Sequence, residues 1–203
     1  MTNVLIIDSA ATGAASVSRK LTREAGETLQ RRDPAVRIVH RDIGAAPVPH
    51  LTEKSVPAIR AGIVENEEAR QALALSDELI AELQDADLII VGAPMYNFGM
   101  PSTLKAWFDH VLRARVTFRY GEAGPEGLLK GKKAIVLEAR AGFYSEGAAS
   151  AMDSQEPHIR NLLGFMGITD VTFVRAEKLA FGPEAAEAAI GEALAEAELK
   201  LAA

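Results

Sequence analysis

The sequence contains no cysteine, and this absence excludes several kinds of chemistry. A chain without thiols forms no disulfide, uses no thiolate nucleophile and offers no thiolate ligand to a metal ion. No apolar run approaches the ~20 residues needed to cross a bilayer, so no membrane segment is expected. The N-terminus also lacks a basic segment followed by an apolar core, which argues against a signal peptide and favours a cytoplasmic protein.

Patterns that would suggest several other functions are equally missing. The net charge of −6 gives no electrostatic reason to expect a nucleic-acid partner. The four histidines show no metal-ligand spacing, so no metal site is expected and packing or surface roles are assigned to them. No Ser/His/Asp triad is indicated, because Asp109 and His110 are neighbours on a predicted helix and cannot face each other. The 203 residues fit one domain, spanning 1–203.

Short apolar runs alternate with amphipathic segments along the chain. The runs are rich in branched residues, as expected of buried parallel strands, at 3–8, 36–40, 87–91, 132–137 and 170–174. Helical spacing of apolar residues is found at 19–32, 67–83, 101–112, 157–168 and 182 to about 199. A short helix is one interpretation of 51–65, and 116–120 is expected to be extended.

Unusual loops follow three of these strands. The stretch at 95–98, Met-Tyr-Asn-Phe, consists of large or polar residues where a plain turn would use small polar ones. It suggests a platform for a flat ligand, or else an ordinary loop whose aromatic rings cover the sheet edge. The loop at 9–18 is small and hydroxylated and leads into a helix, whose free N–H groups would bind an anion. Its alternative is a simple capped turn, with either Ser16 or Ser18 as the N-cap.

The strand pattern predicts a common location for these loops. Five strands alternating with helices indicate an α/β doubly wound parallel sheet with helices on both faces. The natural strand order is the flavodoxin-like 2-1-3-4-5, whose ligand crevice lies between strands one and three. The first loop holds neither Gly-x-Gly-x-x-Gly nor a P-loop motif, so a serine-bound monophosphate fits better than a dinucleotide. The third loop, at 138–144, follows strand four and reaches the same end of the sheet. Three loops that meet there suit a ligand with a phosphate and a planar heterocycle, such as FMN.

Longer motifs give a specific resemblance. These are Ala-Pro-Met-Tyr-Asn-Phe at 93–98, Val-Thr-Phe-Arg-Tyr at 116–120, Gly-Pro-Glu-Gly-Leu at 124–128 and Leu-Gly-Phe-Met-Gly-Ile at 163–168. Over nearly its whole length the chain resembles the bacterial FMN-dependent NADH:quinone oxidoreductases, also called FMN-dependent NADH-azoreductases. The resemblance implies a homodimer with active sites at the interface and one FMN per subunit. It also implies ping-pong transfer of two electrons from NADH to quinones and azo compounds, whose azo bonds are cleaved to amines.

The resemblance also implies a set of FMN contacts. They are carried over to Ser9, Ser16, Val17, Ser18, Met95, Tyr96, Asn97, Phe98, Ala139, Arg140, Ala141 and Gly142. No amino acid is assigned as catalytic, because the flavin N5 atom carries the hydride. Two motifs depart from the usual family pattern. Ala10 replaces a frequent serine after the first strand, and Ala139-Arg140-Ala141-Gly142 replaces a frequent Ser-Arg-Gly-Gly after the fourth.

The aromatic residues have two alternative roles, in the substrate slot or in the core. Phe98 is assigned to the slot, whereas Tyr120 and Phe165 fit either role and are included as substrate-binding candidates. Packing is the preferred role of Phe143 and Tyr144, and Trp107 and Phe108 are expected in the core. Two other classes of protein remain open: a flavodoxin-type electron carrier that does not use NADH, and a fold-sharing module without flavin.

Overall fold

The computed structural model describes residues 2–202. Its main sheet has five parallel strands in the order β2-β1-β3-β6-β7, which confirms the predicted 2-1-3-4-5 arrangement. The strands are β1 (Asn3–Asp8), β2 (Arg37–Asp42), β3 (Leu88–Pro94), β6 (Lys133–Ala139) and β7 (Asp170–Ala176). A separate antiparallel hairpin consists of β4 (Phe118–Gly121) and β5 (Gly124–Gly127).

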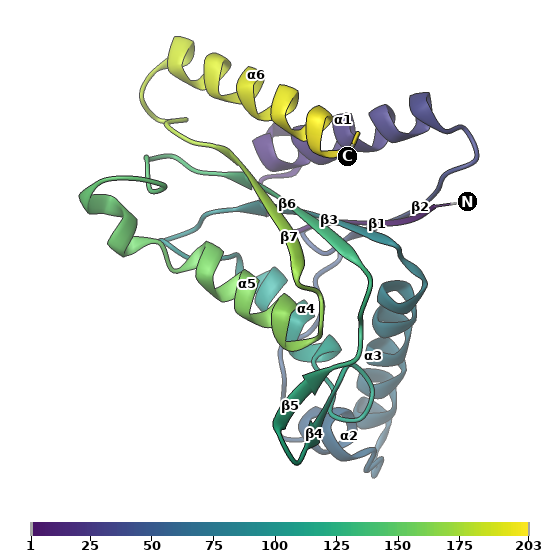
Figure 1. The fold of residues 1–203 in the computed structure, drawn as a ribbon. Coiled ribbons are helices and arrows are strands. Elements are labelled where there is room, and N and C mark those ends of the chain that lie inside the picture. The colour runs from purple at the N-terminus through teal and green to yellow at the C-terminus, as the bar shows by residue number, and fades with distance from the viewer. Residues whose placement is uncertain (1, 203) are drawn as a thin grey trace.

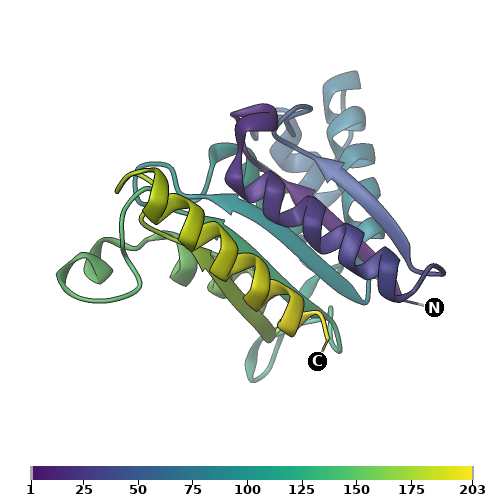
Figure 2. The same ribbon diagram turned by 90° about the horizontal axis from the view of Figure 1, so that it is seen from above.

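Helices cover both faces of the main sheet (Figure 1). The α-helices are α1 (Val17–Arg32), α2 (Ser55–Ala61), α3 (Glu67–Asp85), α4 (Ser102–Val111), α5 (Gln155–Phe165) and α6 (Pro183–Lys200). Two short 3-10 helices, η1 (Gly13–Ala15) and η2 (Ala148–Met152), lie in loops. Figure 2 shows α1 and α6 side by side on one face, while α3, α4 and α5 cover the other. No helix in this part of the chain is long and apolar enough to cross a membrane.

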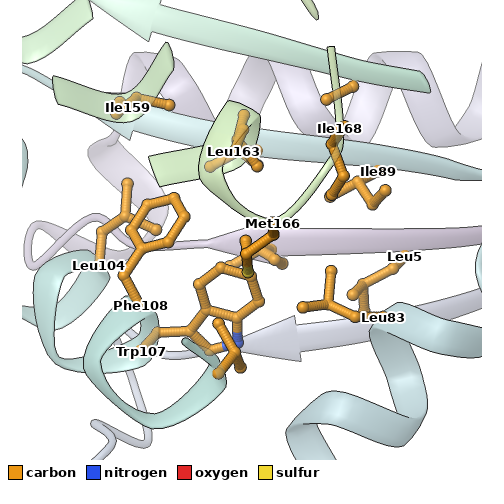
Figure 3. Close-up of a cluster of buried hydrophobic side chains, with 14 of the residues drawn as sticks. Leu5, Leu83, Ile89, Leu104, Trp107, Phe108, Ile159, Leu163, Met166 and Ile168 are labelled. Carbon is orange, nitrogen blue, oxygen red and sulfur yellow. The ribbon is translucent and has the colours of Figure 1, made fainter. Parts of the chain in front are cut away.

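Alternation along the strands builds a core on each face. In β1, Leu5 and Ile7 point to the face covered by α3, α4 and α5, whereas Val4 and Ile6 point to α1 and α6. The larger core contains Trp107 and Phe108, which are fully buried as predicted. Figure 3 shows these rings among aliphatic side chains from β1, β3, α3 and α5.

Four local predictions are refined by the structure. Helix α5 begins at Gln155 and ends at Phe165, so the expected 157–168 helix is displaced by two to three residues. The chain leaves it through Gly167, whose φ of 99° lies in the left-handed region that glycine tolerates. The segment at 51–65 contains α2, which packs against α3. Of the piece at 116–120 expected to be extended, residues 118–120 lie in the first strand of the hairpin, and 116–117 form a turn. Pro101 is the N-cap of α4, and the helix itself begins at Ser102.

Candidate cofactor site

The three unusual loops meet at the carboxyl ends of β1, β3 and β6, as the strand order predicted. The main-chain N–H of Ala11 donates to the phenolic oxygen of Tyr96 over 3.2 Å, which joins the first loop to the second. The N–H of Met95 donates to the carbonyl of Ala139 over 2.9 Å, which joins the second to the third. The carboxyl end of the sheet therefore has a continuous rim built from distant parts of the sequence.

The first loop ends in a capped helix. Ser16 is the N-cap of α1: its hydroxyl accepts a hydrogen bond from the N–H of Arg19 at 3.3 Å and lies 3.0 Å from the hydroxyl of Ser18. The N–H groups of Val17 and Ser18 have no hydrogen-bond partner within residues 2–202. Free N–H groups at the positive end of a 16-residue helix form a site that suits an anion such as a phosphate.

Ser9 occupies a different position from the other serines. It is fully buried, and its hydroxyl donates to the carbonyl of Gly92 over 2.7 Å. The carbonyl of Ser9 in turn accepts a hydrogen bond from Thr103 at 2.8 Å. Ser9 thus ties β1 to β3 and α4, and its predicted phosphate contact would require the hydroxyl to turn away from Gly92.

The second loop is a tight turn with an uncommon backbone. Tyr96 and Gly99 exchange main-chain hydrogen bonds of 2.9 and 3.1 Å, and between them Asn97 and Phe98 have φ angles of 49° and 69°. Two consecutive residues with positive φ are typical of a type I′ turn. Asparagine tolerates this conformation, but phenylalanine rarely adopts it, and such strain is concentrated at functional sites. The N–H groups of Asn97 and Phe98 have no partner in the described residues.

A buried glutamine supports this turn from below. The side-chain amide of Gln155 donates to the carbonyls of Ala93 and Pro94 at 3.0 and 3.1 Å, and Gln155 is fully buried. The preceding residue, Ser154, donates its main-chain N–H to the carbonyl of Phe98 over 3.0 Å. No pattern in the sequence indicates this role, because an amide in the first turn of a helix is most often exposed.

The third loop presents free donors as well. The N–H groups of Ala141 and Gly142 find no partner among residues 2–202, whereas their carbonyls accept hydrogen bonds from Ala180 and Lys178 at 3.0 and 2.8 Å. Pairing with the segment after β7 therefore fixes the loop while its N–H groups stay available. Donors in the second and third loops are the groups that a polar heterocycle edge requires.

The side chain of Arg140 is buried beneath this loop. It is fully inaccessible, and its guanidinium lies 2.6 Å from Glu138, 3.0 Å from Asp153 and 3.3 Å from Glu177. Its main-chain N–H and carbonyl also bond to Ala176 and Leu179. The predicted contact of Arg140 with FMN stays a prediction, and the burial of the guanidinium disfavours a direct one. The geometry instead gives Arg140 a positioning role.

Burial also changes the acidity of the neighbouring carboxyl group. Loss of solvation raises the pKa of Glu138 to about 8, ahead of the opposing effect of the Arg140 guanidinium. The carboxylates around Arg140 raise its pKa although burial lowers it, so this guanidinium remains charged.

The aromatic candidates fall into two groups. Phe98 is 40% exposed, and its ring contacts the edge of Tyr144, with 6.0 Å between the centroids. Tyr120 and Phe165 both pack against Phe118, at centroid distances of 5.6 and 4.6 Å. Tyr120 is nevertheless 73% exposed at the hairpin. Tyr144, expected to have a packing role, lies at the rim of the site through its contact with Phe98.

Two of the four histidines lie within hydrogen-bond distance of neighbouring residues. His40 lies 2.6 Å from the buried carboxylate of Asp8, and the buried His110 lies 3.0 Å from the carbonyl of Pro49. Among the described residues no group of three or more His, Asp or Glu side chains is arranged to hold a metal ion.

A doubly wound sheet with anion and heterocycle donors at its switch point defines a flavodoxin-like class, and the comparisons agree. A family model described as a flavodoxin-like fold matches residues 2–201. An FMN-dependent NADH:quinone oxidoreductase of Hyphomonas neptunium is 56% identical over 94% of this chain and 91% of its own. The FMN-dependent NADH:quinone oxidoreductase 3 of Pseudomonas aeruginosa is 48% identical over 95% of this chain and 90% of its own.

Solved structures give the same result. An azoreductase of Bacillus anthracis matches with a TM-score of 0.90 at 30% identity, covering 99% of both chains. An FMN-dependent NADH-azoreductase of the same species, solved in complex with FMN, has a TM-score of 0.90 at 25% identity, covering 100% of this chain and 98% of that one. The chain belongs to the family of FMN-dependent NADH:quinone oxidoreductases. The resemblance drawn from the sequence motifs is thereby confirmed.

Proposed function

We propose that this protein is an FMN-dependent oxidoreductase that transfers two electrons from NADH to quinones and to azo compounds. The observation that carries the proposal is the meeting of three loops at the switch point, each with main-chain N–H groups that no described residue occupies. Its relatives and structural neighbours bear names for NADH-driven quinone and azo reduction. FMN supplies the hydride-accepting and hydride-donating chemistry when bound.

The residues present fit FMN at both of its ends. In this assignment the N–H groups of Val17 and Ser18, together with the Ser16 hydroxyl, hold the phosphate at the start of α1. Small side chains line the third loop at Ala139, Ala141 and Gly142, so the backbone there is open to close approach by a ring. The turn from Met95 to Phe98 would hold the ring and the sugar chain.

Hydrogen-bond donors at the second and third loops have a chemical role as well as a binding role. Free N–H groups at 97–98 and 141–142 would stabilise negative charge on the polar edge of a reduced ring. Phe98 would close one side of the substrate slot, and Tyr120 and Phe165 are the further candidates for stacking on a substrate. Protons for the product would come from water, so no acidic side chain is required.

The proposal extends to the whole chain and its assembly. We assign residues 1–203 to one FMN-binding domain that acts as a homodimer with the active sites at the subunit interface. The strong exposure of Tyr120 on the hairpin supports this, because exposed aromatic rings are enriched at interfaces. Light scattering on the purified protein measures the subunit number directly. The cytoplasmic location stays a prediction from the sequence.

An anaerobic titration tests the proposed activity. The FMN-loaded protein is mixed with NADH while the visible absorbance of oxidised flavin is followed. Rapid bleaching, with recovery on adding a benzoquinone or an azo dye, is the expected result. Bound FMN that NADH leaves unbleached would indicate an electron carrier of the flavodoxin type. Failure of the purified protein to bind FMN would overturn the cofactor assignment.

A further inference from the structure

A cluster of charged side chains lies directly beneath the third loop. It consists of four carboxyl groups and three guanidinium groups, here called the Arg140 cluster: Glu138, Asp153, Glu156, Glu177, Arg140, Arg160 and Arg175. The charged groups lie at the ends of β6 and β7 and just before or within α5. The other strand next to β6 is β3, which places the apolar Ala93 opposite Glu138. Four acids against three cations leave one carboxyl group in excess.

Three of the four carboxylates are well supplied with donors. Asp153 accepts hydrogen bonds from the N–H groups of Gln155 and Glu156 at 2.8 and 3.1 Å. Glu156 receives the guanidinium of Arg175 at 2.5 Å and that of Arg160 at 2.9 Å. Glu177 binds the loop itself: it accepts from the N–H groups of Tyr144 and Ser145 and from the Ser145 hydroxyl, at 2.8, 3.1 and 2.5 Å. Hydrogen bonds to an ionised carboxylate favour the charged form.

Glu138 is the exception. One of its oxygens contacts Arg140 at 2.6 Å, but the other, Oε1, is buried and has no hydrogen-bond partner in the described part of the chain. The whole side chain is inaccessible to water. A buried ionised carboxylate with an unsatisfied oxygen is strongly unfavourable, whereas protonation of the carboxyl group removes the charge. The carboxyl group that is in excess over the guanidinium groups, and that carries a proton, is therefore Glu138. Burial raises its pKa, which agrees with this assignment.

The position of Glu138 connects this proton with the cofactor site. Glu138 and Arg140 lie on either side of Ala139, immediately before the free N–H groups of Ala141 and Gly142. Glu177 holds the same loop further on, at Tyr144 and Ser145. The loop is thus held on both sides of its free donors by members of one cluster whose charges nearly cancel.

We propose that Glu138 is a positioning residue that holds a proton at neutral pH and thereby keeps the 139–145 loop in the form that binds the cofactor. Loss of this proton leaves one carboxylate of the Arg140 cluster without a compensating positive charge and loosens the loop. The inference rests on the proposed function, in which residues 139–142 contact FMN. It adds a pH-dependent control of cofactor affinity to that site.

The experiment measures the FMN dissociation constant of the apoprotein from pH 6 to pH 10. The variants are the wild type, Glu138→Gln, which mimics the protonated side chain, and Glu82→Gln, a control that removes a glutamate paired with Arg41 far from the loop. The expected dissociation constant of the wild type rises by up to about fivefold between pH 8 and pH 9 and by up to about tenfold more by pH 10, because the protonated fraction falls tenfold per pH unit well above the pKa. The Glu138→Gln variant lacks this rise, and Glu82→Gln follows the wild type. A Glu138→Gln curve that follows the wild type overturns the proposal.

A second measurement needs no FMN. The side-chain carboxyl carbons of glutamate are followed by ¹³C NMR in the wild-type apoprotein during a pH titration. One resonance that titrates near pH 8 in the wild type and is missing from Glu138→Gln would assign the proton to Glu138. Titration of every glutamate below pH 6 would overturn the proposal, even if FMN binds. This measurement stands on the wild type should the variant fail to fold. If the resonance titrates near pH 8 but the wild type binds no FMN at any pH, the proposed function fails, and the positioning role fails with it.

Discussion

The main-chain N–H of Ala11 donates a hydrogen bond to the phenolic oxygen of Tyr96, across 3.2 Å and 85 positions of the sequence. This contact joins the loop after β1 to the loop after β3, which together form the phosphate side and the ring side of the proposed site. It fixes the separation of the two loops before any ligand arrives. A preformed site loses less ordering entropy on binding.

Replacing Tyr96 by phenylalanine tests the importance of this contact. The ring remains, but the acceptor for the Ala11 N–H is lost, and a neutral hydrogen bond contributes ~1 kcal/mol. We expect the FMN affinity of the apoprotein to fall about two- to fivefold, measured by the quenching of flavin fluorescence. Tyr120→Phe, which removes a phenolic hydroxyl on the hairpin and keeps the ring, is the matched control. Equal affinities of Tyr96→Phe and the wild type would show that the contact contributes nothing to the site.

The backbone strain at Phe98 predicts an unusual order of stability. With φ at 69°, alanine keeps the left-handed penalty of about 1–2 kcal/mol, whereas glycine does not. We therefore expect Phe98→Gly to unfold at a higher urea concentration than Phe98→Ala, although glycine normally destabilises a chain relative to alanine. Both variants lose the Phe98 ring, so the comparison isolates the backbone. The reverse order would contradict a left-handed Phe98 in solution.

Gly142 leaves room for the ring of Tyr144. A Cβ atom at this position would lie 2.8 Å from both the Cζ and the hydroxyl oxygen of Tyr144. Because the far end of a side chain can swing away, Gly142→Ala should fold normally but lose the contact between Tyr144 and Phe98, worth about 0.5–1.5 kcal/mol. We expect a several-fold weaker affinity for FMN, measured with the purified apoprotein.

Two further variants of the third loop serve as controls for this prediction. Ala141→Gly removes a methyl group from the neighbouring residue and should leave FMN affinity within about twofold of the wild type, since it breaks no hydrogen bond. In Gly142→Ala combined with Tyr144→Ala the clash no longer exists. The double variant should therefore bind FMN no more weakly than Tyr144→Ala alone. Additive losses in the double variant would argue against the clash.

Arg140 should be among the residues that the fold tolerates least. Its replacement by methionine leaves Glu138, Asp153 and Glu177 without their shared cation, and removal of one partner from a buried ion pair costs about 3–5 kcal/mol. Chemical denaturation of the purified variant and of the wild type measures this loss. Arg119→Met, on the exposed hairpin, should change stability by less than ~1 kcal/mol.

The raised pKa of Glu138 also predicts how stability depends on pH. The folded protein keeps this proton up to about pH 8, whereas an unfolded glutamate releases it near its ordinary pKa of ~4.3. The unfolded state therefore binds fewer protons over this window, so this group stabilises the fold fully at low pH and progressively less up to about pH 8. Denaturation curves of Glu138→Gln should lack this decline, which amounts to a few kcal/mol at ~1.4 kcal/mol per pKa unit. If the unfolding free energy of Glu138→Gln declined with pH as steeply as that of the wild type, the proton would be on another group.

Local patterns were sufficient for much of the molecule. Branched apolar runs located the five parallel strands, and their alternation with helices predicted the order β2-β1-β3-β6-β7. That order placed the serine loop, the Met-Tyr-Asn-Phe turn and the loop after β6 at one end of the sheet. The helical face containing Trp107 and Phe108 was likewise recognised as core. These features follow from the period of side chains along a strand or a helix, which neighbouring residues determine.

Only the tertiary structure decided how the site is supported. Arginine and glutamine are normally exposed, so nothing in the chain marked Arg140 and Gln155 as fully buried. Their roles depend on contacts with residues 37 and 62 positions away, at Glu177 and Ala93. The proton assigned to Glu138 has the same origin, because a pKa depends on the charges and the solvent that packing places around a carboxyl group. The sequence alone predicted the end of the sheet at which a ligand would bind, because strand and helix periods are local, and the packed structure decided which side chains hold those loops in place.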